Sequence, residues 1–396
     1  MRRAPQKARG GFTLIEIMVA LAVGGIAIGS LYAVGAASTR HFRDQQRISA
    51  AQTSLRSALD QLKHDFQRAG YMASPNSLMA GETCFPPQGV DGQNNRLAAL
   101  FWYTKNVDPA PTKLDPDGLN VLNPPFYTVD DVWLSGNYST SGEYPNITVE
   151  TDGVTVRVPM AWQAFRRDFT TWTGVNAGDC DLAAFEAAFP VGRLVRLHAQ
   201  NGGFFYSRVA RTACSGSSRE PSGDFAVVVL TEAVPTTCGM TGGWIAPVNV
   251  MRYSVVNATA TEDASDGRMT VLRRTEMRPD QHTNPLLAIA GGNGQPIEDR
   301  ALLDYVVRFS VDFLMRDVST RVMNYSLRPS AEVLANPERI RGVVLDVAVR
   351  TSQSEPDFTR GVPEAAFRVH PKGEGAARVR RARAELLLPN VANRGL

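Results

Sequence analysis

Residues 10–21 read Gly-Gly-Phe-Thr-Leu-Ile-Glu-Ile-Met-Val-Ala-Leu, and this stretch decides the fold. It opens an almost wholly apolar segment that runs from Phe12 to Ala37 and contains a single charge, Glu16. As a helix, these 26 residues would extend about 39 Å, which exceeds the roughly 30 Å of a bilayer's hydrocarbon core. We therefore predict a membrane helix or the apolar shaft of an assembly. Glu16 then needs a partner, because a carboxylate in hydrocarbon is costly unless it is paired.

The short segment before this helix carries the signals for its orientation. Residues 1–11 contain four basic side chains and no acidic one. By the positive-inside rule this end stays in the cytoplasm, and the rest of the chain crosses the membrane. A conventional secretory signal places its small cleavage-site residues after the apolar region. Here Gly10 and Gly11 come before it, so cleavage at this point would leave the apolar segment in the mature protein.

The sequence G-F-T-L-I-E behind a basic leader resembles the class III signal of type IV prepilins and type II secretion pseudopilins. The resemblance implies cleavage between Gly11 and Phe12 by a prepilin peptidase, and N-methylation of the new Phe12 amine. It also implies that Glu16 neutralises the N-terminal amine of a neighbouring subunit in a filament. The alternative is that Glu16 lies close enough to the membrane surface to be solvated. Major pilins commonly carry a proline in this helix, whereas this chain has glycines at 24, 25 and 29.

The helix is predicted to continue beyond the membrane. Within residues 38–69, apolar side chains recur at spacings of 7, 4, 3 and 4 and so form one helical stripe: Ile48, Leu55, Leu59, Leu62 and Phe66. We interpret this stripe as a face packed against a sheet, with no cofactor. Gly70 is expected to end the helix.

The remaining chain reads as loops followed by strands. Residues 72–190 are predicted to be a loop-rich insertion or subdomain, with a hairpin at 147–158 and a short helix at 181–189 that Asp181 caps. Alternating apolar residues predict strands at 193–198, 204–211, 225–232, 249–256, 269–274, 307–313, 343–349 and 378–388.

The predicted fold class is α+β and pilin-like, with the long helix packed on an antiparallel sheet. The predicted divisions are a cleaved leader (1–11), a long helix (12–71) with its membrane or filament-core part at 12–37, the insertion (72–190) and a β-sheet head (191–396).

Four cysteines follow the apolar segment at spacings of 96, 34 and 24 residues: Cys84, Cys180, Cys214 and Cys238. They form no Cys-x-x-Cys pair and have no paired histidines beside them, which argues against a zinc site. An even number of cysteines behind an export-type N-terminus favours two disulfides in an oxidising compartment. Four cysteines allow three connectivities. Of these we favour Cys84–Cys180 with Cys214–Cys238.

No pattern of an enzyme or a cofactor site is present in the sequence. The five histidines lack metal-binding spacing, and no G-x-S-x-G, Walker or dinucleotide-binding loop occurs. We predict a non-enzymatic protein without cofactor or metal. Residues 115–120 resemble part of a calcium loop but lack its distal glutamate, so a turn is favoured. A net charge of +3 does not indicate a nucleic acid partner. We interpret the basic cluster Arg378, Arg380, Arg381 and Arg383 as a charged edge strand in preference to a phosphate site.

The order of the C-terminal segments 303–309, 341–350 and 386–390 resembles the PilW group of minor pilins, which is related to the J-type pseudopilin of type II secretion. The resemblance implies a structural subunit that helps to initiate type IV pilus assembly in a tip or priming complex. The implied partners are other minor pilins, the major pilin, the prepilin peptidase, the inner-membrane assembly platform and a tip adhesin.

The implied location is the inner membrane with a periplasmic head, and then the pilus at the cell surface. Two alternatives stay open: a type II secretion pseudopilin, and a helix-anchored periplasmic binding protein or hydrolase. The choice between twitching motility, cell adhesion and DNA uptake also stays open.

Overall fold

The computed structural model describes residues 12–73, 99–102, 127–171, 179–214, 224–257, 269–277, 296–316, 323–326, 339–355, 358, 365–369 and 375–392. The chain divides into two compact units, residues 1–53 and 54–396. We call the second of these the head unit. The helix α1 (Leu14–Gln67) begins in the first unit and ends in the head unit.

The described part of the first unit is the beginning of α1 with the two residues before it, and its apolar portion is exposed. Nearly every side chain from residue 12 to residue 46 is exposed to solvent. Large apolar side chains among them include Phe12, Leu21 and Leu31, which are 86%, 71% and 72% exposed. Because no described residue buries this apolar surface, its extent favours contact with lipid or with other subunits.

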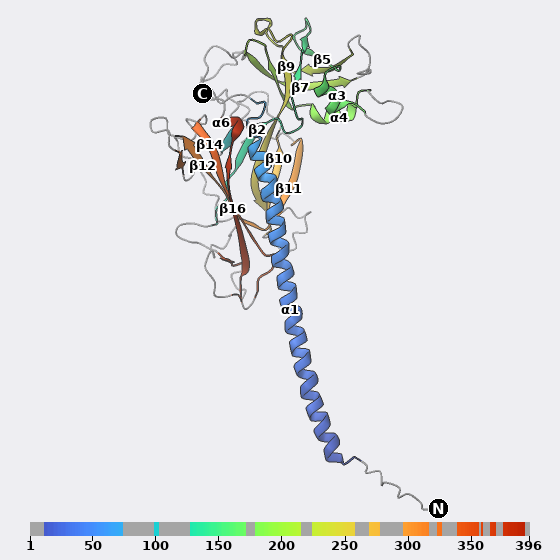
Figure 1. The fold of residues 1–396 in the computed structure, drawn as a ribbon, viewed down its shortest axis with the longest axis vertical. Helices are drawn as coiled ribbons and strands as arrows, with labels where there is room; N and C mark the ends of the chain where they lie inside the picture. The colour runs from blue at the N-terminus through green and yellow to red at the C-terminus, as the bar shows by residue number, and fades with distance from the viewer. Residues whose placement is uncertain are drawn as a thin grey trace, which may run out of the picture. The chain divides into compact units, whose positions relative to one another are not determined.

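The head unit is dominated by antiparallel sheet (Figure 1). The larger sheet follows the order β1-β2-β9-β6-β7-β8-β5-β4, with β3 and β10 also paired to β9, and β11 paired to β10. Its strands are β1 (Leu100–Trp102), β2 (Val132–Gly136), β3 (Tyr144–Pro145), β4 (Thr148–Val149), β5 (Thr155–Pro159), β6 (Leu194–His198), β7 (Phe204–Cys214), β8 (Phe225–Leu230), β9 (Trp244–Asn257), β10 (Thr270–Glu276) and β11 (Glu298–Asp304).

A second sheet has the order β13-β12-β14-β16-β15. Its strands are β12 (Val306–Arg316), β13 (Met323–Ser326), β14 (Ile340–Arg350), β15 (Ala366–Phe367) and β16 (Ala377–Leu387). Short helices complete the described elements: α3 (Gln163–Phe169), α4 (Leu182–Ala188), a 3₁₀ turn at Thr236–Cys238 and α6 (Pro389–Ala392).

The α+β fold class predicted from the sequence is confirmed, and each strand predicted after residue 191 is present with shifted ends. The hairpin at 147–158 forms as β4 and β5. The short helix forms as α4, and the Asp181 side chain accepts a hydrogen bond from the Ala184 backbone N–H, as its predicted cap. Several described elements were not predicted: strands β1, β2, β3, β11, β13 and β15 and helices α3 and α6. The division at residue 190 stays a prediction, although β5 before it pairs with β8 after it.

Helix α1 ends at Gln67, and Gly70 follows with φ of +76° in the turn that leaves the helix. That left-handed conformation favours glycine. A Cβ added at Gly70 would also lie 3.0 Å from Ala99 Cβ. The helix therefore ends three residues before Gly70, and Gly70 lies in the turn that follows with the left-handed conformation expected of a glycine at a helix end.

The end of α1 is anchored in the head unit by a buried carboxylate, Asp65, which is 2% exposed. Its Oδ2 accepts hydrogen bonds from Arg274 Nε at 2.8 Å and from the Tyr253 hydroxyl. Its Oδ1 accepts a bond from Gln61 Nε2 at 3.0 Å. Tyr253 and Arg274 face each other on β9 and β10. One acidic side chain of the helix thus joins two neighbouring strands.

Apolar contacts surround this anchor. The stripe predicted from the sequence is buried in full: Ile48, Leu55, Leu59, Leu62 and Phe66. The rings of Phe66 and Tyr253 lie 6.0 Å apart. Burial, together with the charge of Asp65, raises the pKa of the Tyr253 hydroxyl well above its ordinary value. Tyr253 is therefore a neutral donor to Asp65 at any physiological pH.

The second sheet contains a comparable ionic contact at Asp346 on β14. Arg381 on β16 donates to it at 2.6 and 2.7 Å, and Arg308 on β12 at 2.8 Å. Burial acts to raise the pKa of Asp346, but the hydrogen bond from Arg381 and the charge of Arg308 outweigh it and hold the pKa below its ordinary value. Three adjacent strands are joined by one carboxylate.

Substitution of Asp65 by Asn should destabilise the head unit strongly. Arg274 would lose its buried counter-charge and keep only the half-exposed Glu298, whose Oε2 accepts from Arg274 Nη1 at 3.2 Å. Breaking a buried ion pair costs about 3–5 kcal/mol. The free energy of unfolding, measured by denaturant titration in detergent with the near-ultraviolet circular dichroism signal, should fall accordingly.

The matched control is Asp60→Asn, because Asp60 forms a surface pair with Lys63 at 3.2 Å and its side chain is 74% exposed. Its removal should change stability by about 0.5 kcal/mol or less. Equal effects of the two substitutions would contradict the anchoring role of Asp65.

Asp346 should make the free energy of unfolding of the head unit depend on pH. Its pKa in the folded protein is lowered, so its contribution is present above the unfolded-state value of about 4 and is lost as the pH falls through the folded-state pKa. The stability difference between the wild type and Asp346→Asn should therefore be largest at neutral pH and shrink below pH about 4. A difference that stayed constant from pH 7 to pH 3 would show that the carboxylate charge is not what stabilises the sheet.

Candidate functional site at the start of the helix

The first turn of α1 is closed by a reciprocal capping box between Thr13 and Glu16. The Thr13 backbone N–H and hydroxyl donate to Glu16 Oε2 at 2.9 and 3.0 Å. The Glu16 backbone N–H donates in turn to Thr13 Oγ1 at 3.3 Å. Thr13 is the residue before the helix and Glu16 its third residue, which is the spacing of the Thr-x-x-Glu capping box.

This geometry gives Glu16 a partner inside its own chain. The resemblance to type IV prepilins implies a partner in another subunit, and Thr13 was not predicted as a partner, although the Thr-x-x-Glu pattern was the available signal. The negative charge also lies at the positive end of the helix dipole. The pairing of Glu16 with a neighbour's amine stays a prediction.

The predicted cleavage site is described on one side only. Phe12 is present and 86% exposed, whereas Gly10 and Gly11 lie outside the described residues. Cleavage and methylation therefore remain predictions. The helix that follows is long and apolar enough to cross a membrane, and its most apolar window is exposed. A signal sequence would have the same length and apolar composition.

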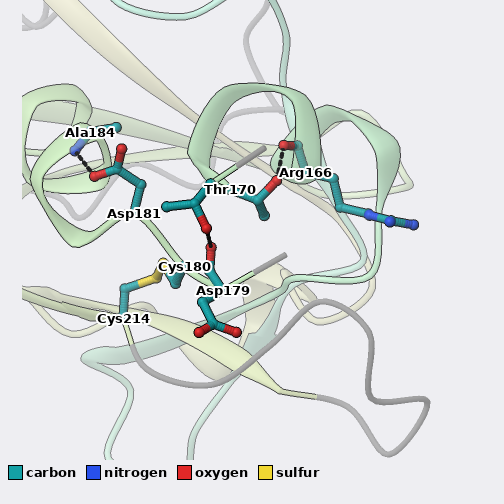
Figure 2. The surroundings of a disulfide bond; sticks show 8 residues. Arg166, Thr170, Asp179, Cys180, Asp181, Ala184 and Cys214 are labelled. Atoms are coloured by element: carbon teal, nitrogen blue, oxygen red, sulfur yellow. Dashed lines mark hydrogen bonds between the residues drawn. A yellow bond between two sulfur atoms is a disulfide. The ribbon is translucent and has the colours of Figure 1, made fainter. Parts of the chain in front are cut away.

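The favoured disulfide pairing was wrong, because Cys180 is bonded to Cys214 (Figure 2). A β-bridge between Thr170 and Cys180 and the cap of α4 at Asp181 hold Cys180 beside the end of β7, where Cys214 lies. Sequence spacing carries no information on this proximity. Cys238 is also disulfide-bonded, and Cys84 lies outside the described residues.

The arginine cluster of β16 is engaged within its own sheet. Arg378 pairs with Glu355 at 2.6 Å and Arg381 with Asp346 at 2.6 Å. These contacts favour a structural role over a phosphate site. The predicted edge position was wrong at the start of β16, because β15 pairs with it at Ala377 and Arg378. The calcium-like segment 115–120 lies outside the described residues. Among the residues that are described, no group of His, Cys, Asp and Glu could hold a metal ion.

Comparison with known proteins gives one match. The prokaryotic N-terminal methylation motif matches residues 6–32, which include Phe12, Thr13 and Glu16. No curated protein and no solved structure matches the chain. The motif indicates a protein of the type IV pilin or pseudopilin kind, which fits an apolar N-terminal helix joined to an antiparallel β-sheet unit. It points to a structural protein that interacts with other pilus or pseudopilus components.

Replacement of Thr13 by Val should loosen the first turn of α1. Valine keeps the shape of threonine but cannot accept from the Glu16 N–H or donate to its carboxylate, and loss of such a cap costs about 1 kcal/mol. Amide hydrogen exchange of residues 14–17, measured in detergent micelles, should become about fivefold faster. Thr13→Ser keeps the hydroxyl and should exchange like the wild type. Equal rates in the valine and serine variants would show that the capping box is not formed in the micelle.

Proposed function

We propose that this protein is a non-enzymatic minor pilin of the PilW type that helps to initiate type IV pilus assembly within a tip or priming complex. The observation that carries the proposal is the methylation motif at residues 6–32 at the start of one long helix, which ends inside a large β-sheet unit. The subunit is made as an inner-membrane prepilin with its head in the periplasm. The prepilin peptidase processes it between Gly11 and Phe12.

Cleavage and assembly are chemically linked in this proposal. While Gly11 is joined to Phe12, the nitrogen of Phe12 is a neutral amide. Cleavage converts it into an amine, which carries a positive charge in its protonated form. Only then can it neutralise the Glu16 carboxylate of a neighbouring subunit in the apolar filament core. The order of events is therefore cleavage first and pairing second.

The capping box does not prevent this pairing. Both hydrogen bonds from Thr13 go to Oε2 of Glu16. A carboxylate accepts at about four positions, so an amine can be added while the cap persists. The hydrogen bonds from Thr13 satisfy the Glu16 carboxylate before assembly, which lowers the free-energy cost of placing this charge in the membrane.

The size of the head unit favours a terminal position. It spans residues 54–396, which is 343 residues (396 − 53). A unit of this size fits more readily at a filament end than in a tightly packed shaft, where every subunit has neighbours on all sides. Immunogold label should accordingly mark pilus ends. Label spread evenly along the shafts would contradict the terminal position.

A type II secretion pseudopilin is the second candidate, because the methylation motif supports it equally. Gene deletion separates the two functions. Loss of surface pili with normal exoprotein secretion supports the minor pilin, and the reverse result supports the pseudopilin. A helix-anchored binding protein or hydrolase would need neither cleavage at Gly11 nor the Glu16 carboxylate.

Two substitutions should interrupt the proposed pathway at different steps. Gly11→Ala should block cleavage, so that the full-length precursor accumulates in membranes. Glu16→Ala should be cleaved normally but lose incorporation into sheared filaments by about tenfold or more, because the neighbour's amine then lacks its counter-charge. Asp44→Ala is the control for loss of an acidic side chain on the same helix. It should behave like the wild type, because Asp44 forms a partly exposed pair with Arg47 at 3.6 Å, three residues along the helix, and such pairs contribute little. Normal filament incorporation of Glu16→Ala would contradict the proposed pairing.

A further inference from the structure

The chain between β2 and the second half of β9 is an insertion into a hairpin. β2 ends at Gly136, and Asn249 of β9 lies directly opposite it in the antiparallel register. The 112 residues between them (248 − 136) leave and return at adjacent points. Two neighbouring strands of this kind are normally joined by a turn of two to five residues. We call residues 137–248 the α3–α4 lobe.

This lobe has a hydrophobic core made from its own residues. The core has 22 buried members, all of which lie between Tyr144 and Ile245. Its centre is a cluster of aromatic rings at 5.1 to 6.2 Å from one another: Tyr144, Phe165, Phe169, Phe185 and Phe189. The partly buried apolar side chains packed against this core also belong to the lobe. A segment that buries its own apolar surface has the main requirement of an independent folding unit.

The lobe also has its own covalent and secondary-structure framework. β5, β8, β7 and β6 follow one another in the sheet, and α4 packs against β7 (Figure 1). The disulfide Cys180–Cys214 joins the start of α4 to the end of β7, within the lobe (Figure 2). It therefore constrains the unfolded form of the lobe without constraining α1 or β10.

The junction with the rest of the head unit includes polar contacts to the end of α1 and the turn after it. Arg68 donates to the carbonyls of Asn137 and Thr140 at 2.7 and 2.8 Å. The Tyr138 hydroxyl donates to the Asp65 carbonyl at 2.9 Å, and Arg196 donates to the Ala73 carbonyl at 2.9 Å.

Arg193 donates to Glu276 of β10 at 2.6 and 2.7 Å, and to the carbonyls of Ala187 and Ala188 at the end of α4. Among the described residues, the apolar cluster at this junction has six buried members, against 22 in the core of the lobe: Ala73, Trp133, Leu194, Tyr206, Val248 and Val250.

Asn249 lies where β9 changes partner from β6 to β2. It is 1% exposed. Its amide donates to Glu276 at 2.9 Å and to Ser139 at 2.8 Å, while its oxygen accepts from the Tyr138 N–H at 2.9 Å. These bonds position the two ends of the lobe, but they do not build its core.

We propose that the α3–α4 lobe is a separate cooperative folding unit, which opens as a whole while α1, β2 and β10 remain folded. Proteins commonly unfold in such contiguous units below the global transition. The inference concerns the folded head unit and is independent of the pilin assignment. It also predicts that substitutions in the lobe leave cleavage at Gly11 and pairing at Glu16 intact.

The test is hydrogen exchange with mass spectrometry on the full chain in detergent, comparing the wild type with Cys180→Ser/Cys214→Ser. A double variant is preferred to chemical reduction, because Cys238 is also disulfide-bonded. Protection within residues 144–245 should fall on the order of 30-fold or more. Protection of residues 54–71 and 249–276 should stay within about twofold of the wild type.

The reciprocal variant is Leu62→Ala, which opens a cavity beneath α1 at a residue that is fully buried. It should lower protection of residues 54–71 and 249–276 and leave 144–214 unchanged. Parallel loss of protection across all these regions in either variant would overturn the proposal. Failure of the wild-type chain to be cleaved at Gly11 would count against the proposed function and leave this inference untouched.

Discussion

The ion pair between Asp65 and Arg274 is the interaction on which the head unit depends, because it joins the end of α1 to the strands that the larger sheet is built around. Arg274 lies on β10 opposite Tyr253 of β9, and both donate to the same carboxylate oxygen. β9 in turn pairs with β2, β3, β6 and β10. A shift of the helix by one residue would rotate Asp65 by about 100° and break these bonds together. Burial of the apolar stripe stabilises the packing of α1, and the buried Asp65 carboxylate fixes the position of α1 along β9 and β10.

Two carboxylates of α1, Asp65 and Glu16, both need partners for a negative charge beside apolar side chains, but their surroundings differ. Asp65 is enclosed by protein and is matched by an arginine and a tyrosine of the head. Glu16 lies in the exposed apolar part and is matched in its own chain by uncharged Thr13 donors. Among the residues that the structure describes, no cation pairs with Glu16, and this is the chemical basis for proposing a cationic partner after cleavage.

The sequence predicted those parts of the fold that follow from local periodicity. The alternation around Val311 and Leu345 predicted β12 and β14, and Asp181 predicted the start of α4, since each pattern lies within a few residues. The exposed strand β11, with its irregular sequence, offered no alternation to read. Contacts between distant residues, such as Cys180 with Cys214, depend on tertiary proximity that spacing does not encode. In the candidate site, Glu16 was identified while its capping residue was missed.

In the proposed function, the mature chain begins at a methylated Phe12, two residues before α1, and is held in a filament. Mass spectrometry of the N-terminal peptide, recovered from sheared surface filaments, tests both points together. The peptide should start at Phe12 and carry one additional methyl group on its amine. A peptide that retains Met1 or residues 2–11, or that starts beyond Ala37, would contradict the proposed function.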